Sequence, residues 1–246
     1  MRLAICLGFG IWSLGFLKQM KDLIDTLIEQ RYLKTSSIID AFKKIDRADF
    51  LPEEIKDEAG LNIPLSIGYG QTISQPLTVA FMLELLEPKP GDKILDIGSG
   101  SGWTTALLAH IVSQKRNPKS QILNSTQIPN PKPQNLKCKV IAIEIIPELM
   151  EFGRKNVSKY NFIEKGIVNF ICANGRKGFI KEAPFDKILV SAAVDKIPQT
   201  LKEQLKIGGR LVIPVKSSIF LVIRKDRNRY EEKEFYGFAF VPLVKE

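Results

Sequence analysis

An acid and a run of glycines stand together at residues 96–102, where they could hold a small ligand. Asp96 comes first, and GSGSG follows it at residues 98–102. Glycine lets the backbone approach a ligand closely and adopt conformations that other residues avoid. The preceding residues 93–97 have the composition of a buried strand, and residues 103–112 are expected to form a helix. A strand, a glycine turn and a helix in this order predict a ligand site at the carboxyl end of the strand.

The spacing of the glycines indicates which ligand to expect. Gly98, Gly100 and Gly102 give a G-x-G-x-G pattern with Ser99 inside it, whereas the dinucleotide fingerprint is G-x-G-x-x-G. The tighter pattern, preceded by an acid, suits the amino-acid end of S-adenosyl-L-methionine, whose ammonium group needs a carboxylate or carbonyl partner. S-adenosyl-L-methionine is therefore the expected cofactor, and a nicotinamide oxidoreductase is disfavoured.

Glu144 is a second acid at the end of an expected strand, residues 140–144. An acid in this place commonly binds ribose hydroxyls. The usual offset from the glycine motif is about 20 residues, and the polar segment 115–139 accounts for the longer gap here. Two acids at strand ends favour a nucleoside ligand over two exposed surface carboxylates.

Strands that alternate with helices predict right-handed βαβ units and a doubly wound, Rossmann-like α/β sheet that is mostly parallel. The last strands follow one another without helices and are expected to form an antiparallel edge. Residues 63–76 are expected to form a loop with at most short strands. The expected strands are 93–97, 140–144, 168–172, 185–191, 210–214, 218–224 and 235–244, and the expected helices are 20–33, a second one capped by Ser36 or Ser37, 77–86, 103–112, 147–159 and 198–205.

Five sequence blocks together resemble the protein-L-isoaspartate O-methyltransferase family, in matching order and spacing over about residues 20–246. The block GQTISQP and the terminal VPL distinguish this family from other methyltransferases that share the glycine motif. The blocks are SIGYGQTISQP (66–76), LDIGSGSGWTTALLA (95–109), VIAIEIIPEL (140–149), GGRLVIPV (208–215) and FVPLV (240–244).

The resemblance implies methyl transfer from S-adenosyl-L-methionine to the α-carboxylate of L-isoaspartyl residues in damaged proteins or peptides, without a metal. Ser74 would be the active-site serine. Val241, Pro242 and Leu243 would bind the substrate backbone together with Ser74. The residues implied in cofactor binding are Thr72, Ile73, Ser74, Asp96, Gly98, Ser99, Gly100, Gly102, Glu144, Ile145, Asn174 and Gly175.

Asn174 departs from the family pattern. Residues 173–175 (Ala-Asn-Gly) match a family Gly-Asp-Gly whose acid pairs with the adenine amino group. An asparagine oxygen can still accept this hydrogen bond, and its amide can donate to a ring nitrogen. The charge-assisted part of the interaction is lost, so weaker cofactor binding is expected.

The chemistry needs little proton transfer. A carboxylate with a pKa near ~4 is already ionised at pH 7, so no strong general base is required. Catalysis then consists mainly of aligning the carboxylate with the methyl group, and Ser74 would orient that carboxylate by a hydrogen bond. His110 is the only histidine, and we expect it to be a packing or surface residue.

The net charge of +9 is unevenly distributed. Residues 115–139 carry +6 and residues 1–19 carry +2, which leaves +1 for the rest of the 246-residue chain. A basic loop on a nearly neutral body differs from the basic face of a nucleic-acid-binding protein. No nucleic-acid partner is expected, and residues 115–139 are expected to be a polar loop insertion.

Residues 3–17 form an apolar run behind Arg2. The run is shorter than the ~20 residues of a membrane span, and no small-residue cleavage site follows it. The preferred interpretation is a mis-assigned start, with residues 20–246 as a single methyltransferase domain that begins at Met20. An N-terminal membrane anchor or an uncleaved signal is the alternative, and only then is a membrane or export expected.

The cysteines favour a reducing compartment. Cys6, Cys138 and Cys172 are odd in number and far apart, which argues against a disulfide framework and against a zinc site. A cytoplasmic location is therefore expected, and the protein is separately expected to be a monomer.

Two further functions remain open at this point. A methyltransferase acting on RNA or a small molecule is supported by the basic segment 115–139 and opposed by the block GQTISQP. A non-catalytic relative that binds the cofactor or damaged protein is supported by Asn174.

Overall fold

The computed structural model describes residues 8–115 and 140–243, with side chains from residue 19 onward. The helices are α1 (Gly8–Glu29), α2 (Ser36–Lys44), α3 (Pro76–Leu86), α4 (Trp103–Ser113), α5 (Pro147–Ser158) and α6 (Gln199–Glu203), with short 3-10 helices η1 (Arg47–Phe50), η2 (Glu53–Glu58), η4 (Gly175–Lys177) and η5 (Ile180–Glu182). The strands are β1 (Leu65–Gly68), β2 (Gln71–Ile73), β3 (Ile94–Ile97), β4 (Val140–Glu144), β5 (Val168–Cys172), β6 (Phe185–Val190), β7 (Leu205–Val215), β8 (Ser218–Arg224) and β9 (Tyr230–Tyr236).

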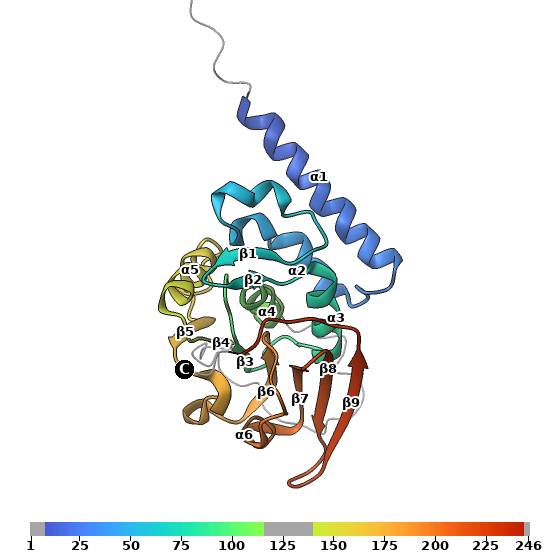
Figure 1. Cartoon of the computed structure of the whole chain (residues 1–246), viewed down its shortest axis with the longest axis vertical. Coiled ribbons are helices and arrows are strands. Elements are labelled where there is room, and N and C mark those ends of the chain that lie inside the picture. Colours follow the sequence, from blue (N-terminus) through green and yellow to red (C-terminus); the bar gives the residue numbers. More distant parts are fainter. Residues whose placement is uncertain (1–7, 116–139, 244–246) are drawn as a thin grey trace, which may run out of the picture.

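Seven strands form one sheet in the order β5-β4-β3-β6-β7-β8-β9 (Figure 1). Strands β3 to β7 pair in parallel, and β8 and β9 add antiparallel pairs at one edge. In the middle of the sheet Ile97 of β3 lies between Ile143 of β4 and Val190 of β6. The predicted doubly wound, mostly parallel sheet with an antiparallel edge is thus confirmed.

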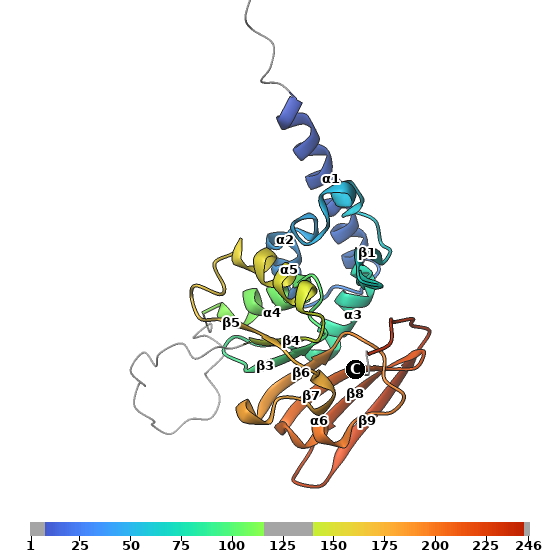
Figure 2. The same ribbon diagram turned by 60° about the vertical axis from the view of Figure 1, so that its left-hand side comes forward.

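The central strands are mainly apolar because both faces of the sheet are covered. Ile94 belongs to the core on the face of α4 and α5, whereas Leu95 and Ile97 belong to the core on the face of α6. Figure 2 shows α4 and α5 on one side of the sheet and α6 on the other. All four residues of β3 and all five of β4 are buried, so their ends hold the neighbouring turns rigidly.

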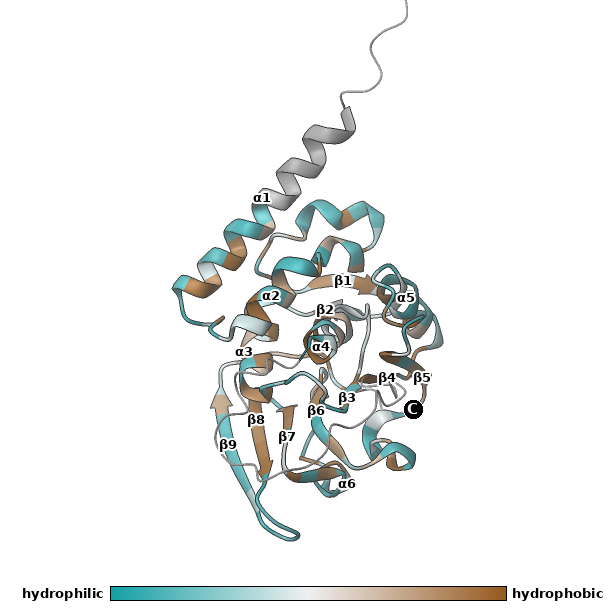
Figure 3. Ribbon diagram, turned by 180° about the vertical axis from the view of Figure 1, so that it is seen from behind, coloured by the Kyte–Doolittle hydropathy of each residue, from teal (hydrophilic) through white to brown (hydrophobic). Residues whose placement is uncertain are grey.

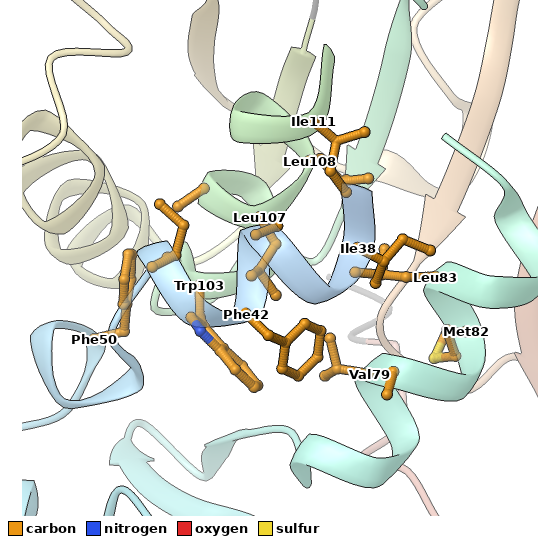
Figure 4. Close-up of a cluster of buried hydrophobic side chains, with 14 of the residues drawn as sticks. Ile38, Phe42, Phe50, Val79, Met82, Leu83, Trp103, Leu107, Leu108 and Ile111 are labelled. Atoms are coloured by element: carbon orange, nitrogen blue, oxygen red, sulfur yellow. The ribbon is translucent and has the colours of Figure 1, made fainter. Parts of the chain in front are cut away.

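The larger core joins the N-terminal helices to the glycine-turn unit. Trp103, the first residue of α4, contacts Phe42 of α2 edge-to-face at 5.5 Å between ring centres (Figure 4). Ile38 of α2 and Leu107 of α4 lie in the same cluster. The site is therefore built on a helix that is packed on several sides.

The first two helices differ in their ends from the prediction. Helix α1 begins at Gly8 instead of Met20 and ends at Glu29, and Arg31 then adopts a left-handed conformation with φ of 61°. Thr35 rather than Ser36 or Ser37 precedes α2 as its N-cap residue. Its backbone N–H and hydroxyl both donate to the carboxylate of Glu84 on α3, so a contact distant in sequence selects this helix start.

The C-terminal elements differ more. Helix α6 is shorter than the predicted 198–205, and β7 already begins at Leu205 and continues through Gly208 and Gly209. The register between β6 and β7 shifts at this point, and a Cβ at Gly209 would lie 2.8 Å from the carbonyl oxygen of Lys206. Glycine thus permits an irregular strand here instead of ending a helix.

The last strand begins five residues before the predicted 235–244 and overlaps it only at residues 235 and 236. Strand β9 covers Tyr230–Tyr236, and Gly237 then turns the chain with φ of 93°. Figure 3 shows β9 as largely hydrophilic beside the hydrophobic β8. An edge strand with exposed side chains has no buried face to mark it in the sequence. The polar segment 115–139 lies, after Lys115, outside the described residues.

Candidate active site

A pocket opens at the carboxyl ends of β3 and β4, next to the hairpin β1–β2 and the last described residues of the chain. Each predicted site residue lines this pocket, except Asp96 and Gly102. The lining residues are Gln71, Thr72, Ile73, Ser74, Ile97, Gly98, Ser99, Gly100, Ser101, Trp103, Thr104, Ile143, Glu144, Ile145, Ala173, Asn174, Gly175, Ser191, Ala192, Val241, Pro242 and Leu243.

The glycine turn between β3 and α4 needs its glycines for two different reasons. Gly98, Gly100 and Gly102 have positive φ values of 76°, 49° and 86°, which other residues rarely adopt. Gly98 and Gly100 present backbone to the pocket. A Cβ at Gly102 would lie 2.8 Å from the carbonyl oxygen of Gly153, so this glycine permits the close packing of α4 on α5.

Asp96 lies beneath the turn and is fully buried. The hydroxyl of Thr105 in α4 donates to its Oδ2 at 2.6 Å, whereas its Oδ1 has no hydrogen-bond partner among the described residues. Burial raises the pKa of Asp96 to about 7, against the lowering effect of the Thr105 hydrogen bond. Its predicted contact with the methionine part of the cofactor stays a prediction, because the side chain does not line the pocket.

Glu144 joins the end of β4 to the glycine turn. Its Oε2 accepts the backbone N–H of Gly100 at 2.9 Å, and its Oε1 accepts those of Ile145 and Ile146 at 2.9 and 3.1 Å. A carboxylate has about four lone-pair positions, so one stays available. Glu144 can therefore position the turn and also accept a hydroxyl donor from a ligand.

The donors and acceptors in the pocket fit the expected cofactor. The hydroxyl of Ser99 is buried at the pocket without a hydrogen-bond partner in the described part of the chain, and a buried unpaired hydroxyl is costly. The backbone at Gly98 and Gly100 and the carboxylate of Glu144 stand beside it. This set suits a ligand with an amino-acid part and a ribose.

Asn174 follows β5 and caps the short helix η4. Its Oδ1 accepts the backbone N–H of Arg176 at 3.0 Å. The amide nitrogen has no partner within the described residues, so it can donate to a ligand. At the next position a Cβ on Gly175 would lie 2.4 Å from Cγ2 of Ile97, so packing against β3 requires a glycine there.

The other wall of the pocket comes from two segments far apart in sequence. The antiparallel hairpin β1–β2 carries Thr72 and Ile73, and Ser74 follows it. The C-terminal segment is held against the loop after β6, because Ala193 donates its N–H to Val241 at 2.9 Å and accepts that of Leu243 at 2.8 Å. Both segments line the same pocket as the glycine turn.

A second hollow adjoins the pocket at Thr72, Ser74, Ser191 and Val241. It leads away from the glycine turn between the start of α3 and the segment after β9. Its remaining lining residues are Pro64, Gln75, Leu77, Thr78, Gly237, Phe238, Ala239 and Phe240.

His110 lies on α4 away from the pocket, as the sequence predicts for a packing or surface residue. Its Nε2 is 2.7 Å from Oδ2 of Asp40 on α2. Among the described residues no group of His, Cys, Asp or Glu side chains could hold a metal ion. Within the same residues, no helix combines the length and apolar character that crossing a membrane requires.

The prediction missed several lining residues, above all Ser191 and Ala192 after β6. Strand β6 is the neighbour of β3, so its carboxyl end meets the same edge of the sheet. That rule could have found them, but no acid or glycine marks them in the sequence. Trp103 was assigned only to the helix, yet it also lines the pocket.

Comparisons with known proteins point to one family. The family model of protein-L-isoaspartate(D-aspartate) O-methyltransferase matches residues 18–246. A protein-L-isoaspartate O-methyltransferase of Methanopyrus kandleri is 37% identical over 235 residues, which cover 94% of this chain and 93% of the relative. One of Flavobacterium psychrophilum is 37% identical over 232 residues, covering 92% and 95%.

Solved structures support the fold. A Plasmodium falciparum protein assigned to the same methyltransferase family, solved with S-adenosyl-L-homocysteine, matches with a TM-score of 0.74 at 21% identity. The match covers 92% of this chain and 99% of the other. On the sequence match over nearly its whole length, this chain belongs to the protein-L-isoaspartate(D-aspartate) O-methyltransferase family.

Proposed function

We propose that this protein transfers a methyl group from S-adenosyl-L-methionine to the α-carboxylate of L-isoaspartyl residues in damaged proteins or peptides. One observation carries the proposal. A single pocket joins the glycine turn and Glu144 on one wall to Ser74 and residues 241–243 on the other. Relatives that are 37% identical over more than 90% of the chain bear the name of this activity.

The cofactor would supply an electrophilic methyl group. On the cofactor wall, the backbone at Gly98 and Gly100 and the hydroxyl of Ser99 would hold its amino-acid part, and Glu144 would accept the ribose hydroxyls. Ile145 next to Glu144 lines the same space, and so do Thr72 and Ile73 from the hairpin on the other wall. The buried, unpaired Ser99 hydroxyl supports this assignment, because a ligand oxygen or nitrogen would satisfy it.

On the substrate wall, Ser74 would orient the isoaspartyl carboxylate. Its hydroxyl has no hydrogen-bond partner within the described residues, so it can donate to a carboxylate oxygen. That carboxylate is ionised at neutral pH, and the protein needs only to align it with the methyl group. His110 is held by Asp40 on the far side of α4 and has no part in this chemistry.

The adjoining hollow supports a polypeptide as the substrate. It begins at Ser74 and Val241 and continues past Phe238 and Phe240. Val241, Pro242 and Leu243 would bind the substrate backbone where the two hollows meet. A small-molecule substrate would have no use for this extension.

The test is methyl transfer from labelled S-adenosyl-L-methionine to a pair of peptides that differ only in an isoaspartyl or an aspartyl residue. We expect base-labile label on the isoaspartyl peptide alone. Label on both peptides would contradict the specificity. Binding of S-adenosyl-L-homocysteine without transfer would favour a non-catalytic relative, and no binding would remove both functions.

We further propose that the protein acts as a monomer in the cytoplasm. The exposed free thiol of Cys172 supports a reducing compartment. The net charge of +9 opposes self-association, and the charged, exposed edge strand β9 discourages pairing with another sheet. Gel filtration at low and high salt tests the oligomeric state.

We also propose that residues 20–246 form the single methyltransferase domain and that residues 1–19 are an extension. The family match begins at residue 18, and among the residues of α1 whose side chains are described, from residue 19 onward, Met20 is the first that belongs to the buried core. We expect the full chain and residues 20–246 to have equal activity and equal thermal stability. A large loss of activity or of thermal stability when residues 1–19 are removed would contradict these domain bounds.

A further inference from the structure

Arg47 is a fully buried cation whose guanidinium group donates hydrogen bonds to four backbone carbonyl oxygens. Its Nη1 donates to the carbonyl oxygens of Ala59 and Leu61 at 3.0 and 2.9 Å. Its Nη2 donates to those of Ile63 and Ser74 at 2.8 and 3.2 Å. The four acceptors span residues 59–74, so a single side chain in η1 holds both ends of the segment that leads to Ser74.

No carboxylate neutralises this charge within the described residues. The carbonyl dipoles and the indole ring of Trp103 surround it, and the guanidinium carbon lies 5.5 Å from the ring centre. Burial lowers the pKa of Arg47 to about 10, so the group remains charged at neutral pH. A buried charge is retained only where several polar groups compensate it, and the planar guanidinium fork is suited to bridge them.

The backbone beside Arg47 is itself fixed. The N–H of Asp46 donates to the hydroxyl of Tyr160 at 3.0 Å, and that hydroxyl donates to Asp49 at 2.7 Å. The ring of Tyr160 stacks on Phe50 at 5.9 Å between ring centres. The guanidinium group therefore extends from a rigid base next to α5.

Arg47 contacts both walls of the pocket. On the substrate wall it holds the carbonyl of Ser74, the residue proposed to orient the carboxylate. On the cofactor wall it packs on Trp103, which begins α4 directly after the glycine turn and contacts Phe42 (Figure 4). A change in the position of Ser74 relative to Trp103 must therefore break a contact of Arg47.

We propose that Arg47 is a positioning residue that sets Ser74 at the correct distance from the cofactor wall by binding the carbonyls of residues 59–74 while it packs on Trp103. This inference rests on the proposed role of Ser74. Lysine cannot replace arginine here, because its ammonium group is a single point and cannot bridge four carbonyls.

Arg224 offers a matched control. It too donates to backbone carbonyls, those of Glu203 and Leu205 at 2.8 and 2.6 Å. It also lies over an aromatic ring, with its guanidinium carbon 5.9 Å from the ring centre of Tyr230. It lines neither the pocket nor the adjoining hollow, so Arg224→Lys removes the same kind of interaction without touching Ser74.

The experiment compares Arg47→Lys and Arg224→Lys in the full chain, below the unfolding temperature of each. For Arg47→Lys we expect kcat for an isoaspartyl peptide to fall about 10- to 100-fold, because small misplacements of a reacting group cost this much. Affinity for S-adenosyl-L-homocysteine should stay close to that of the wild type, and hydrogen exchange should quicken in residues 59–75. Arg224→Lys should keep wild-type kcat and exchange in that segment.

An unchanged kcat in Arg47→Lys would overturn the proposal. The proposal would also be overturned if Arg47→Lys lost cofactor affinity in parallel with kcat and hydrogen exchange quickened uniformly over the chain. That result would mean that Arg47 has a purely structural role. If Arg47→Lys does not fold, Arg47→Gln takes its place, since it leaves no buried charge. A wild type without methyl transfer would refute the proposed function instead, and exchange in residues 59–75 would still show whether Arg47 holds the segment.

Discussion

The carboxylate of Glu144 accepts the backbone N–H of Gly100 at 2.9 Å, so the end of β4 directly fixes the glycine turn that follows β3. The same carboxylate also accepts the N–H groups of Ile145 and Ile146 and lines the pocket. One acid thus shapes this wall of the pocket and remains available to a ligand.

Glu144→Gln should weaken S-adenosyl-L-homocysteine binding by about 10- to 100-fold, because hydrogen bonds to a charged group contribute roughly 1.5–3 kcal/mol. The new amide nitrogen cannot accept an N–H group, so the turn would also loosen. Titration calorimetry measures the affinity, and Glu148→Gln, an exposed acid nearby on α5, is the control. Equal affinities of the two variants would remove Glu144 from cofactor binding.

Ser74→Ala should lower kcat for an isoaspartyl peptide about 10-fold or more, since a hydrogen bond to a carboxylate is lost. Cofactor affinity should change much less, because the glycine turn and Glu144 are untouched. Steady-state kinetics with calorimetry separates the two effects, and Ser66→Ala, exposed in β1 of the same hairpin, is the control. A wild-type rate in Ser74→Ala would exclude the serine from the mechanism.

Asn174→Asp should tighten S-adenosyl-L-homocysteine binding. One carboxylate oxygen would keep the hydrogen bond from the Arg176 N–H, and the other would accept the adenine amino group with a charge-assisted bond, which is roughly twice as strong as a neutral one. Calorimetry at fixed ionic strength measures the change. Weaker binding would show instead that the amide nitrogen of Asn174 is needed as a donor.

Asp96→Asn should stabilise the free protein more at pH 8 than at pH 5. The folded-state pKa of Asp96, about 7, lies above the unfolded value because of burial. The stability that the neutral carboxyl group of Asp96 contributes is therefore fully present below the unfolded pKa of 3.8. It is lost progressively as the pH rises from that value through the folded-state pKa of about 7. Asparagine does not titrate. The stabilisation by Asp96→Asn should therefore be larger at pH 8 than at pH 5 by more than about 1 kcal/mol, given roughly 1.4 kcal/mol per pKa unit.

Thermal or denaturant unfolding at the two pH values checks this prediction, with Asp22→Asn, an exposed acid on α1, as the control. An equal effect of Asp96→Asn at both pH values would mean that the carboxyl group is not held in its neutral form.

The central α/β unit could be predicted closely from the sequence. The bounds of β4 (Val140–Glu144) and β5 (Val168–Cys172) agree with the predicted ranges. In β4 all five residues are buried, and a strand that is covered on both faces needs a mainly apolar sequence. The glycine turn was recognisable because positive φ values require glycine. By contrast, β9 was misplaced, since the exposed edge carries charges instead of an apolar pattern.

The site was predictable where its residues belong to local motifs. Glu144, the glycine turn and the Ser74 loop each stand in a short recognisable block, and the pocket brings these blocks together. Ser191 and Ala192 stand in no such block, and only the position of β6 beside β3 brings them to the pocket.

By itself the sequence determined the local units: the strands, the glycine turn, the two strand-end acids and the family to which they belong. Only the tertiary structure decided that Asp96 is fully buried, that Thr35 is the N-cap residue of α2 and which carbonyl oxygens Arg47 binds. The physical reason is the distance in sequence between the residues that decide each property. Backbone conformation and hydrophobic pattern are properties of neighbouring residues, whereas burial and hydrogen-bond partners depend on residues that only folding brings together.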